Sequence, residues 1–283
     1  MKYTLLLCCH NRFDIVPEGF TPIQCGSALN PPVSEAEKDD VGDNISQKNP
    51  SYCELTAHYF AWKNIDADYY GFCHYRRFFV FNDRIKKPYI VCGTVSENDI
   101  TLLGNRQKLE QIFQNHDMIV TRSENMGLTV SRHYCTSKYH YREDLEQFIR
   151  ILEAQFPDYK IAAERYLSQC SQHFCNMFVM KKADFHEYCS VLFSVLAEFD
   201  KVKRVHGDFQ SDRTDGYLGE IFTGIFIARK REQGLRIKEL PRMDVGCTAK
   251  KRVLYYLLPP ESRARFIVKR WIKKLKRKHE TKT

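Results

Sequence analysis

The sequence predicts an α/β domain built around a mostly parallel sheet. Short segments with the composition of buried strands alternate with segments of helical periodicity, and this alternation favours an α/β sheet over a β-sandwich. The apolar run at residues 3–9 is typical of a strand buried on both faces of a parallel sheet. A chain of 283 residues suffices for one large domain of this class or two small ones.

The expected elements follow one another along the chain. After the first strand, a short strand is predicted at residues 21–25, and a polar loop fills residues 30–50. Ser51 and Glu54 have the spacing of a capping box, which predicts a helix of about three turns beginning at Ser51. An aromatic-rich strand is expected at 69–81. The remaining expected elements are helices at 105–116, 138–156, 181–199 and 216–229, and strands at 116–121 and 174–180.

The positive charge is concentrated at the C-terminus. The formal net charge is +9, and residues 262–283 contain ten Lys/Arg and one Glu, so 10 − 1 = +9 and the rest of the chain is neutral. A neutral body argues against a folded nucleic-acid-binding domain. Periodicity fades near Pro241, so we expect the main domain at 1–240 and a basic, membrane-associating segment at 241–283.

The basic segment has the pattern of an amphipathic helix at residues 262–279. Ile267, Trp271 and Leu275 recur at intervals of four, and Lys and Arg occupy most other positions. A basic helix with Trp on its apolar face is typical of an anionic membrane surface. The alternatives are a solvated tail or a nucleic-acid-binding arm.

The cysteines and the N-terminus favour a cytosolic protein. The chain has eleven cysteines without any CxxC spacing, its N-terminal apolar run is too short for a secretory signal, and no stretch reaches about 20 apolar residues. We expect reduced, mostly buried thiols. A zinc site at Cys170, His173 and Cys175 is a minor alternative, because a fourth ligand at metal spacing is missing.

The first cluster of candidate site residues surrounds the end of the first strand. His10 and Asn11 follow that strand, and Asp43, Asn44 and Asn49 lie in the loop before the predicted helix. Short amide and carboxylate side chains there suit a base and a ribose, and the helix N-terminus suits phosphate. The alternative is that Asp43 and Asn44 only form loop turns.

The second cluster is the run His74-Tyr75-Arg76-Arg77 within an aromatic strand. Strand alternation would place His74 and Arg76 on one face and Tyr75 and Arg77 on the other. Cations in such an apolar strand need anionic partners. A buried carboxylate such as Asp66 or Asp68 is one candidate, and a diphosphate is the other.

The third cluster combines Asn176 in the strand 174–180 with Arg213 and Glu220 further on. A polar residue inside an apolar strand must be hydrogen-bonded. Glu220 lies among apolar helix residues, so burial would raise its pKa and suit it to act as a general base. The alternative is an exposed Glu220 paired with Arg213 or Lys230.

These clusters fall within a segment that resembles a known family. The run from Asp39 to Phe79, with its ELT, WKN and HYRR motifs, resembles the hallmark block of the capsular polysaccharide synthesis glycosyltransferases, a family long known only as a domain of unknown function. The stretches NMFVMKKADF and RTDGYLGEIF resemble its later blocks in order and spacing, and the resemblance covers about residues 3–230.

The resemblance implies a single Rossmann-like domain of the GT-A type that transfers a sugar from a nucleotide-diphosphate donor. Many GT-A enzymes hold a manganese or magnesium ion with an Asp-x-Asp motif after the central strand, whereas this strand ends in HYRR. We therefore expect cationic side chains to neutralise the leaving diphosphate without a required metal. Asp66 and Asp68 have the Asp-x-Asp spelling but precede the strand, so metal binding there is a minor alternative.

The expected reaction is direct displacement at the anomeric carbon, inverting if a single base acts. Some members of the family are associated with galactofuranose transfer, so a hexose carried by UDP, with galactofuranose as one example, is the expected donor. A lipid-linked or growing surface polysaccharide is the expected acceptor, at the inner face of a bacterial membrane. The competing functions are nucleic-acid binding through the tail and a non-catalytic scaffold. The predicted catalytic residues are Glu220, Asp144 as second choice for the base, and Arg76, and the predicted donor-binding residues are His10, Asn11, Asp43, Asn44, Asn49, Lys63, His74, Arg76, Arg77, Asn176 and Arg213.

Overall fold

The computed structural model describes residues 1–137, 139–206, 212–259, 262, 264–265 and 267–268. Ten strands within these residues form one sheet, whose central path runs β11-β7-β10-β4-β1-β2-β3, with β5, β6 and β12 joined beside it. The strands of the sheet are β1 (Tyr3–Cys9), β2 (Thr21–Gln24), β3 (Glu37–Lys38), β4 (Tyr69–His74), β5 (Arg77–Phe79), β6 (Tyr89–Val91), β7 (Met118–Thr121), β10 (Phe178–Lys181), β11 (Ile237–Leu240) and β12 (Arg242–Asp244).

Most pairings along the central path are parallel. Strand β1 runs parallel to both β2 and β4, and β11 runs parallel to β7, whereas β10 is antiparallel to its neighbours β4 and β7. A separate two-stranded sheet joins β8 (Glu124–Asn125) to β9 (Ser171–Gln172). The structure thus confirms the predicted single α/β domain with a mostly parallel central sheet.

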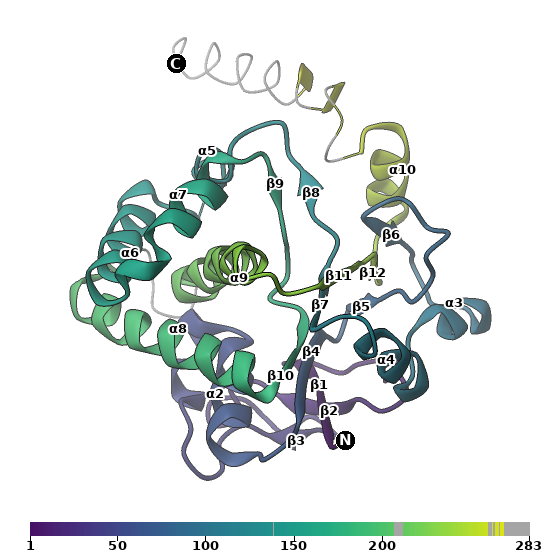
Figure 1. Ribbon diagram of the computed structural model, residues 1–283. Coiled ribbons are helices and arrows are strands. Elements are labelled where there is room, and N and C mark those ends of the chain that lie inside the picture. Colours follow the sequence, from purple (N-terminus) through teal and green to yellow (C-terminus); the bar gives the residue numbers. More distant parts are fainter. Residues whose placement is uncertain (138, 207–211, 260–261, 263, 266, 269–283) are drawn as a thin grey trace, which may run out of the picture.

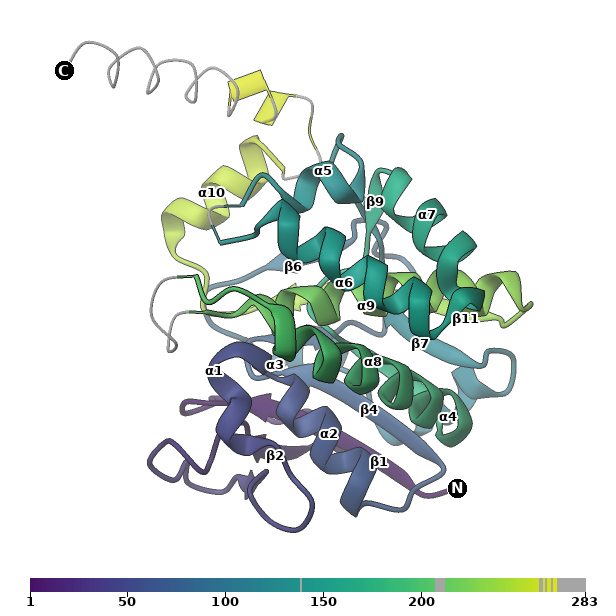
Figure 2. The same ribbon diagram turned by 90° about the vertical axis from the view of Figure 1, so that its left-hand side faces the viewer.

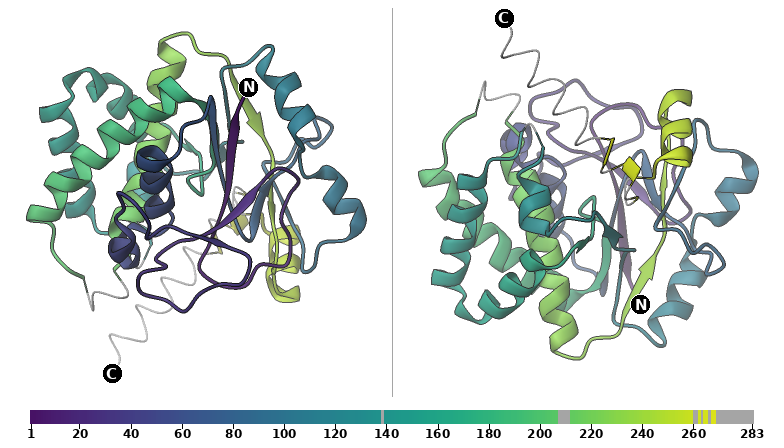
Figure 3. Two further views of the ribbon diagram at one scale, coloured as in Figure 1. Left: turned by 90° about the horizontal axis from the view of Figure 1, so that it is seen from below. Right: turned by 90° about the horizontal axis from the view of Figure 1, so that it is seen from above.

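Helices cover both faces of the sheet (Figures 1 and 3). The helices are α1 (Asn49–Tyr52), α2 (Leu55–Asn64), α3 (Glu97–Leu102), α4 (Arg106–Phe113), α5 (Val130–Tyr134), α6 (Arg142–Gln155), α7 (Lys160–Ser168), α8 (Lys182–Val202), α9 (Thr214–Glu232) and α10 (Ala249–Leu257), with 3₁₀ turns at Ser46–Lys48 and Pro157–Tyr159. In Figure 1, α2 and α6 to α9 lie on one side of the strands, and α3 and α4 lie on the other.

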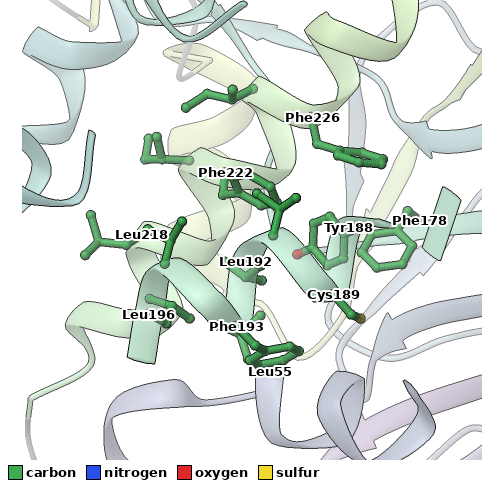
Figure 4. Packing of buried hydrophobic residues seen from close by; sticks show 14 of the residues in the cluster. Leu55, Phe178, Tyr188, Cys189, Leu192, Phe193, Leu196, Leu218, Phe222 and Phe226 are labelled. Carbon is green, nitrogen blue, oxygen red and sulfur yellow. The ribbon is translucent and has the colours of Figure 1, made fainter. Parts of the chain in front are cut away.

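The alternation of side chains along β1 explains why the domain has two cores. Leu6 and Cys8 point into the larger core, which also contains buried residues of α2, α6, α8 and α9. Leu5 and Leu7 point into the smaller core on the opposite face. Figure 4 shows the larger core, where side chains of α8 and α9 pack together beside Phe178 of β10.

Two predicted elements differ from the structure around the candidate site. The expected strand at 69–81 is two strands, because the chain turns at Tyr75–Arg76 and His74 pairs with Arg77 across an antiparallel hairpin. The expected strand at 174–180 begins only at Phe178. The alternation predicted for the HYRR run was therefore wrong, since it assumed continuous extended backbone.

The predicted capping box was also wrong. Helix α2 begins at Leu55 rather than at Ser51. Its N-cap residue is Glu54, whose side chain makes no capping hydrogen bond. Ser51 lies in the short helix α1 and its hydroxyl donates to Asp215 instead. Cys53, with φ of 53°, interrupts the helical backbone between α1 and α2, so Ser51 and Glu54 do not belong to one helix.

The sheet continues past the expected boundary at Pro241. Strand β12 pairs with β5 and β6, so residues 242–244 belong to the same sheet as the rest of the domain. The division into 1–240 and 241–283 therefore does not coincide with the end of the sheet. The basic helix expected at 262–279 falls mostly outside the described residues. Within the described part of the chain, no helix has the length and apolar content needed to cross a bilayer.

Candidate active site

A pocket of about 270 Å³ opens at the carboxyl ends of β1 and β4. The two strands are parallel, with Cys8 opposite His74, so His10 after β1 and His74 at the end of β4 meet at one edge of the sheet. Open α/β sheets bind ligands at this edge. The pocket is lined by Cys8, Cys9, His10, Cys25, Asn49, Pro50, Cys53, Glu54, His74 and Arg213.

The two histidines of the pocket are neutral hydrogen-bonding groups. Burial, with help from Arg77 and Arg76, lowers the pKa of His74 to about 2. Its Nδ1 accepts a hydrogen bond from the backbone amide of Arg76 at 3.2 Å, so the ring proton resides on Nε2. Burial likewise lowers the pKa of His10. The imidazoles therefore offer N–H donors rather than the positive charge expected from the sequence.

The positive charge at the mouth of the pocket comes from arginines. Arg213 lines the pocket and donates from Nε to the sulfur of Cys53 at 3.2 Å. Arg76 is exposed and its guanidinium lies over the ring of Tyr75. Among the described residues, neither arginine forms an ion pair with a carboxylate. Both guanidinium groups thus remain open to an anionic ligand.

Arg77 has a protein carboxylate as its partner, which was one of the two alternatives that the sequence left open. Its Nε lies 3.7 Å from Asp244 on β12, while Asp244 also accepts a bond from the buried Arg242. Arg242 reaches Glu124 as well, at 2.8 Å. These charges form a network behind the pocket, in which protein carboxylates neutralise both arginines.

Two carboxylates lie beside the pocket. Glu54 lines it directly, and its Oε1 accepts from Nδ2 of Asn176 at 3.0 Å. Glu220 on α9 accepts a bond from the backbone amide of Cys175 at 2.5 Å. Burial, reinforced by the nearby charge of Glu54, raises the pKa of Glu220 to about 7 against the pull of the Cys175 amide. A carboxylate with this pKa exchanges protons readily near neutral pH.

Asn176 links Glu54 to helix α9 through its side chain. The sequence predicted that this polar residue must be hydrogen-bonded, and it is. Its amide donates to Glu54 and to the carbonyl of Gly216, and its Oδ1 accepts from Thr223 of α9. Its φ of 47° lies in the left-handed region, as do those of Cys175 at 81° and Cys53 at 53°. Three strained non-glycine residues therefore meet around the two carboxylates.

Small residues on α9 allow this close approach. A Cβ added at Gly216 would lie 2.9 Å from the sulfur of Cys53, and one at Gly219 would lie 2.6 Å from Leu55. Glycine at both positions lets the start of α9 pack against the junction of α1 and α2. This contact brings Arg213, at the N-cap of α9, to the pocket.

A comparison with known families places the chain among proteins of this fold. A model described as a domain of unknown function, DUF4422, matches residues 4–231. The chain belongs to the DUF4422 family. A solved structure of the bifunctional glycosyltransferase WbbM, in its apo form, resembles the domain with a TM-score of 0.81 and 28% sequence identity. The similarity covers 87% of this chain but 46% of WbbM, so the chain spans about half the length of that protein. No curated protein matches the chain.

These findings confirm the family recognised in the sequence and the GT-A-like fold that it implied. The matched region ends within α9 and includes the whole lining of the pocket. The pocket is therefore part of the DUF4422 domain itself.

Some predicted site residues lie away from the pocket of the DUF4422 domain. Asp43 accepts from the hydroxyl of Tyr59, and its amide donates to Asn64 at the far end of α2. Asn44 follows in the same loop, and Lys63 stacks on Trp62 at that end of the helix. Ten residues of α-helix, or about 15 Å, separate this end from the pocket. Asn11 lines a neighbouring hollow of about 580 Å³ that shares His10 with the pocket.

Asp144, the second choice for the base, also lies elsewhere. It is buried at the start of α6 and its carboxylate lies 2.8 Å from Nε2 of His206. Lys230, one of the two cations expected as a partner of an exposed Glu220, pairs instead with Asp184 and Glu187.

Asp66 and Asp68 do not lie where a metal site at the carboxyl end of β4 would need them. They precede β4, so the length of the strand, about 17 Å, separates them from the pocket at its carboxyl end. Asp66 is paired with Lys182, and Asp68 accepts from the backbone amide of Lys2. Among the described residues, no group of three or more His, Cys, Asp or Glu side chains is arranged to hold a metal ion, and this includes Cys170, His173 and Cys175.

Sequence reasoning missed two residues that shape the pocket, Glu54 and Cys53. Glu54 was interpreted as part of a capping box, and that interpretation hid its role as the only carboxylate among the residues that line the pocket. Cys53 carried no signal, because a left-handed cysteine has no sequence signature. The aspartate Asp39 was also passed over, although it is fully buried and accepts bonds from Gly26, Ser27 and Ser46 that shape the loop beside the pocket.

Proposed function

We propose that the chain is a glycosyltransferase that uses a nucleotide-diphosphate sugar as donor. The observation that carries this proposal is the pocket at the carboxyl ends of β1 and β4. Arg213 lines it and Arg76 lies near its two histidines, and neither arginine has a carboxylate partner among the described residues. Two guanidinium groups without a carboxylate partner suit a diphosphate, because a guanidinium group can bind phosphate oxygens in bidentate geometry. The likeness to WbbM, which is described as a glycosyltransferase, supports the same class of reaction.

In this proposal the arginines stabilise the leaving group. Negative charge develops on the diphosphate as the anomeric bond breaks, and Arg213 and Arg76 neutralise that charge. The neutral His10 and His74 donate hydrogen bonds to the same oxygens. No step is assigned to a metal ion, since Asp66 and Asp68 lie at the other end of β4.

The acceptor hydroxyl needs a base, and we assign this role to Glu220. Its pKa, raised to about 7, lets the side chain exchange a proton with the acceptor hydroxyl near neutral pH. Glu54, positioned by Asn176, lines the pocket and orients the substrate. Direct attack by the activated hydroxyl inverts the anomeric configuration.

The finer identity of the substrates rests on the family resemblance. We propose a UDP-linked hexose, with galactofuranose as the first sugar to test, and a lipid-linked or growing surface polysaccharide as acceptor. The enzyme would work at the inner face of a bacterial membrane, with residues 262–283 held by anionic lipid. Division of labour between the folded domain, which includes β12, and residues 262–283 is part of the proposal.

Donor binding can be tested without knowing the acceptor. A ligand that binds only the folded protein raises the melting temperature, so we expect UDP and at least one UDP-hexose to do so. Replacing Arg213 by alanine removes charge-assisted bonds worth about 1.5–3 kcal/mol, and should weaken nucleotide binding about 10- to 100-fold. Arg150→Ala, an exposed change on α6, is the matched control.

Two outcomes of the binding experiment would count against the proposed donor site. Absence of any thermal shift across the common nucleotides and nucleotide sugars, with and without manganese, would contradict the proposal. Equal binding by the Arg213→Ala variant and the wild type would move the diphosphate to another part of the molecule.

A further inference from the structure

We propose that α10 and β6 form a docking surface for an anionic lipid bilayer. This inference deepens the proposed function, on which it rests for its biological purpose, and adds β6 and α10 to the membrane contact proposed for residues 262–283. Helix α10 has no buried residue, although four of its nine residues are large and apolar or aromatic with exposed side chains. Val253 is 57% exposed, Tyr256 80% and Leu257 67%.

The exposed side chains share one stripe of the helix. Val253, Tyr256 and Leu257 are spaced i, i+3 and i+4, so they project from the same face. A stripe of this kind normally faces a protein core. Here it faces outward, which is the arrangement of a helix that lies in a membrane interface.

The charge around the stripe complements anionic lipid. Residues 84–95, which include β6, and residues 245–259, which include α10, contain no Asp or Glu. Their cations are Arg84, Lys86, Lys87, Lys250, Lys251 and Arg252. Cations beside an exposed apolar stripe are the combination that anionic bilayers attract.

A groove of about 690 Å³ runs between the two elements and extends the surface. Its lining includes the aliphatic side chains of Ile85, Ile90 and Val253, with Lys87 and Arg252 among its charged residues. The ring of Tyr255 packs edge-on against Tyr89 of β6, with centroids 5.3 Å apart. Tyrosines with an apolar body and a polar tip are enriched at the level of lipid headgroups.

The backbone fixes this surface relative to the domain. The side chain of Thr248 caps α10 by accepting from the amide of Lys251. The amides of Gly246 and Cys247 donate to the carbonyls of Gly93 and Cys92, each at 3.0 Å. Docking of α10 would therefore orient the whole domain.

That orientation serves the pocket. The amide of Val245, just before α10, donates to the carbonyl of Arg76 at 2.9 Å, so the docking surface begins next to the arginine turn of the site. In Figures 2 and 3, α10 lies on the same side of the domain as α1, and the N-terminus lies on the opposite side. An acceptor anchored in the bilayer would meet the mouth of the pocket.

A bilayer fits these observations better than a nucleic acid. Phosphates would attract the cations but would leave Val253 and Leu257 in water, and burial of apolar surface contributes to affinity only where an acyl boundary covers it. Binding to duplex or single-stranded DNA is therefore an outcome that the test must exclude.

The test is sedimentation of the full chain with vesicles of phosphatidylcholine, with or without 30% phosphatidylglycerol (about one lipid in three, a typical anionic fraction). We expect binding to anionic vesicles only. The double variant Tyr256→Ser/Leu257→Ser should weaken the partition coefficient about tenfold or more. The triple variant Lys250→Gln/Lys251→Gln/Arg252→Gln should weaken it about 100-fold, at roughly fivefold for each cation.

Ile161→Ser provides the matched control. Ile161 on α7 is 65% exposed, close to the 67% of Leu257, and lies outside the proposed surface. Unchanged binding by the double and triple variants would overturn the inference and leave residues 262–283 as the sole membrane contact. The inference would also be overturned if the wild type bound DNA but did not bind anionic vesicles. The thermal shift with UDP-sugars should be equal in all these variants, so failure of the docking surface and failure of the proposed reaction remain distinguishable.

Discussion

Replacing Glu220 by glutamine is expected to lower kcat about 10²- to 10⁴-fold, the range for loss of a general base. Glutamine keeps the shape of the side chain and can still accept the hydrogen bond from the amide of Cys175. It cannot take up a proton from the acceptor hydroxyl. Steady-state turnover with a UDP-sugar and a synthetic acceptor measures the change, and Glu54→Gln is the informative comparison, since Glu54 lines the pocket directly.

The pH profile separates the two carboxylates. A base must be deprotonated to act, so kcat/KM of the wild type should rise with pH and level off above about 7, the pKa to which burial raises Glu220. The Glu220→Gln variant should lose this rise. If Glu54→Gln abolishes turnover while Glu220→Gln retains both rate and pH dependence, the base is Glu54 instead.

Stability provides an independent check on the same residue. The pKa of Glu220 is higher in the folded state than in an unfolded chain, so the folded state binds its proton more tightly. The stabilisation is complete below an unfolded pKa near 4.5 and is lost as pH rises through about 7. The Glu220→Gln variant should therefore gain stability relative to the wild type between pH 4.5 and pH 8, by roughly 3 kcal/mol in urea unfolding.

The second large effect is expected at Asp215, which supports the pocket from behind. Asp215 is fully buried at the start of α9, accepts from the hydroxyl of Ser51 in α1, and pairs with Lys203 at 2.5 Å. Burial raises the pKa of Asp215 in spite of Lys203, so desolvation outweighs the attraction between the two charges. Asp215→Ala should nevertheless lower the free energy of unfolding by about 3 kcal/mol, because it leaves Lys203 and Ser51 without this partner.

A double variant tests that explanation. Lys203 keeps a second carboxylate, Asp200 at 2.8 Å, so the remaining charge is only partly compensated. Asp215→Ala combined with Lys203→Met should recover part of the lost stability in urea unfolding. Additive losses in the double variant would show that the buried pair itself is not the source of the effect. Lys201→Met, at an exposed residue near the end of α8, is the control.

The sheet could be predicted from the sequence because its strands carry their own pattern. Residues 3–9 form β1 as expected, and residues 118–121 lie within the predicted strand at 116–121. The strand after Tyr69 was predicted too long because the aromatic run continues through the turn into β5, and both halves are apolar enough to be buried. Hairpin turns without Gly, Asn or Pro, such as the one at Tyr75–Arg76, lack the usual signal.

The candidate site was predictable where it follows strand ends. His10 and His74 were expected at the sheet edge, and the parallel pairing of β1 and β4 brings them there. The loop residues Asp43 and Asn44 were not placed correctly with them, because the path of a long polar loop depends on tertiary bonds such as those of Asn64. Glu54 could not be recognised as a pocket residue, since its position depends on the left-handed backbone conformation of Cys53, which the sequence does not indicate.

The left-handed residues around the pocket have a consequence for how such domains evolve. Cys53, Cys175 and Asn176 each hold a backbone conformation that costs of order 1–3 kcal/mol, and the surrounding core must supply that free energy. Glycine at these positions would remove the steric penalty and let the loops relax. Selection for thermal stability alone would therefore favour glycine at these positions. A domain that keeps these side chains has lower stability, and in return its pocket is preorganised before the ligand binds.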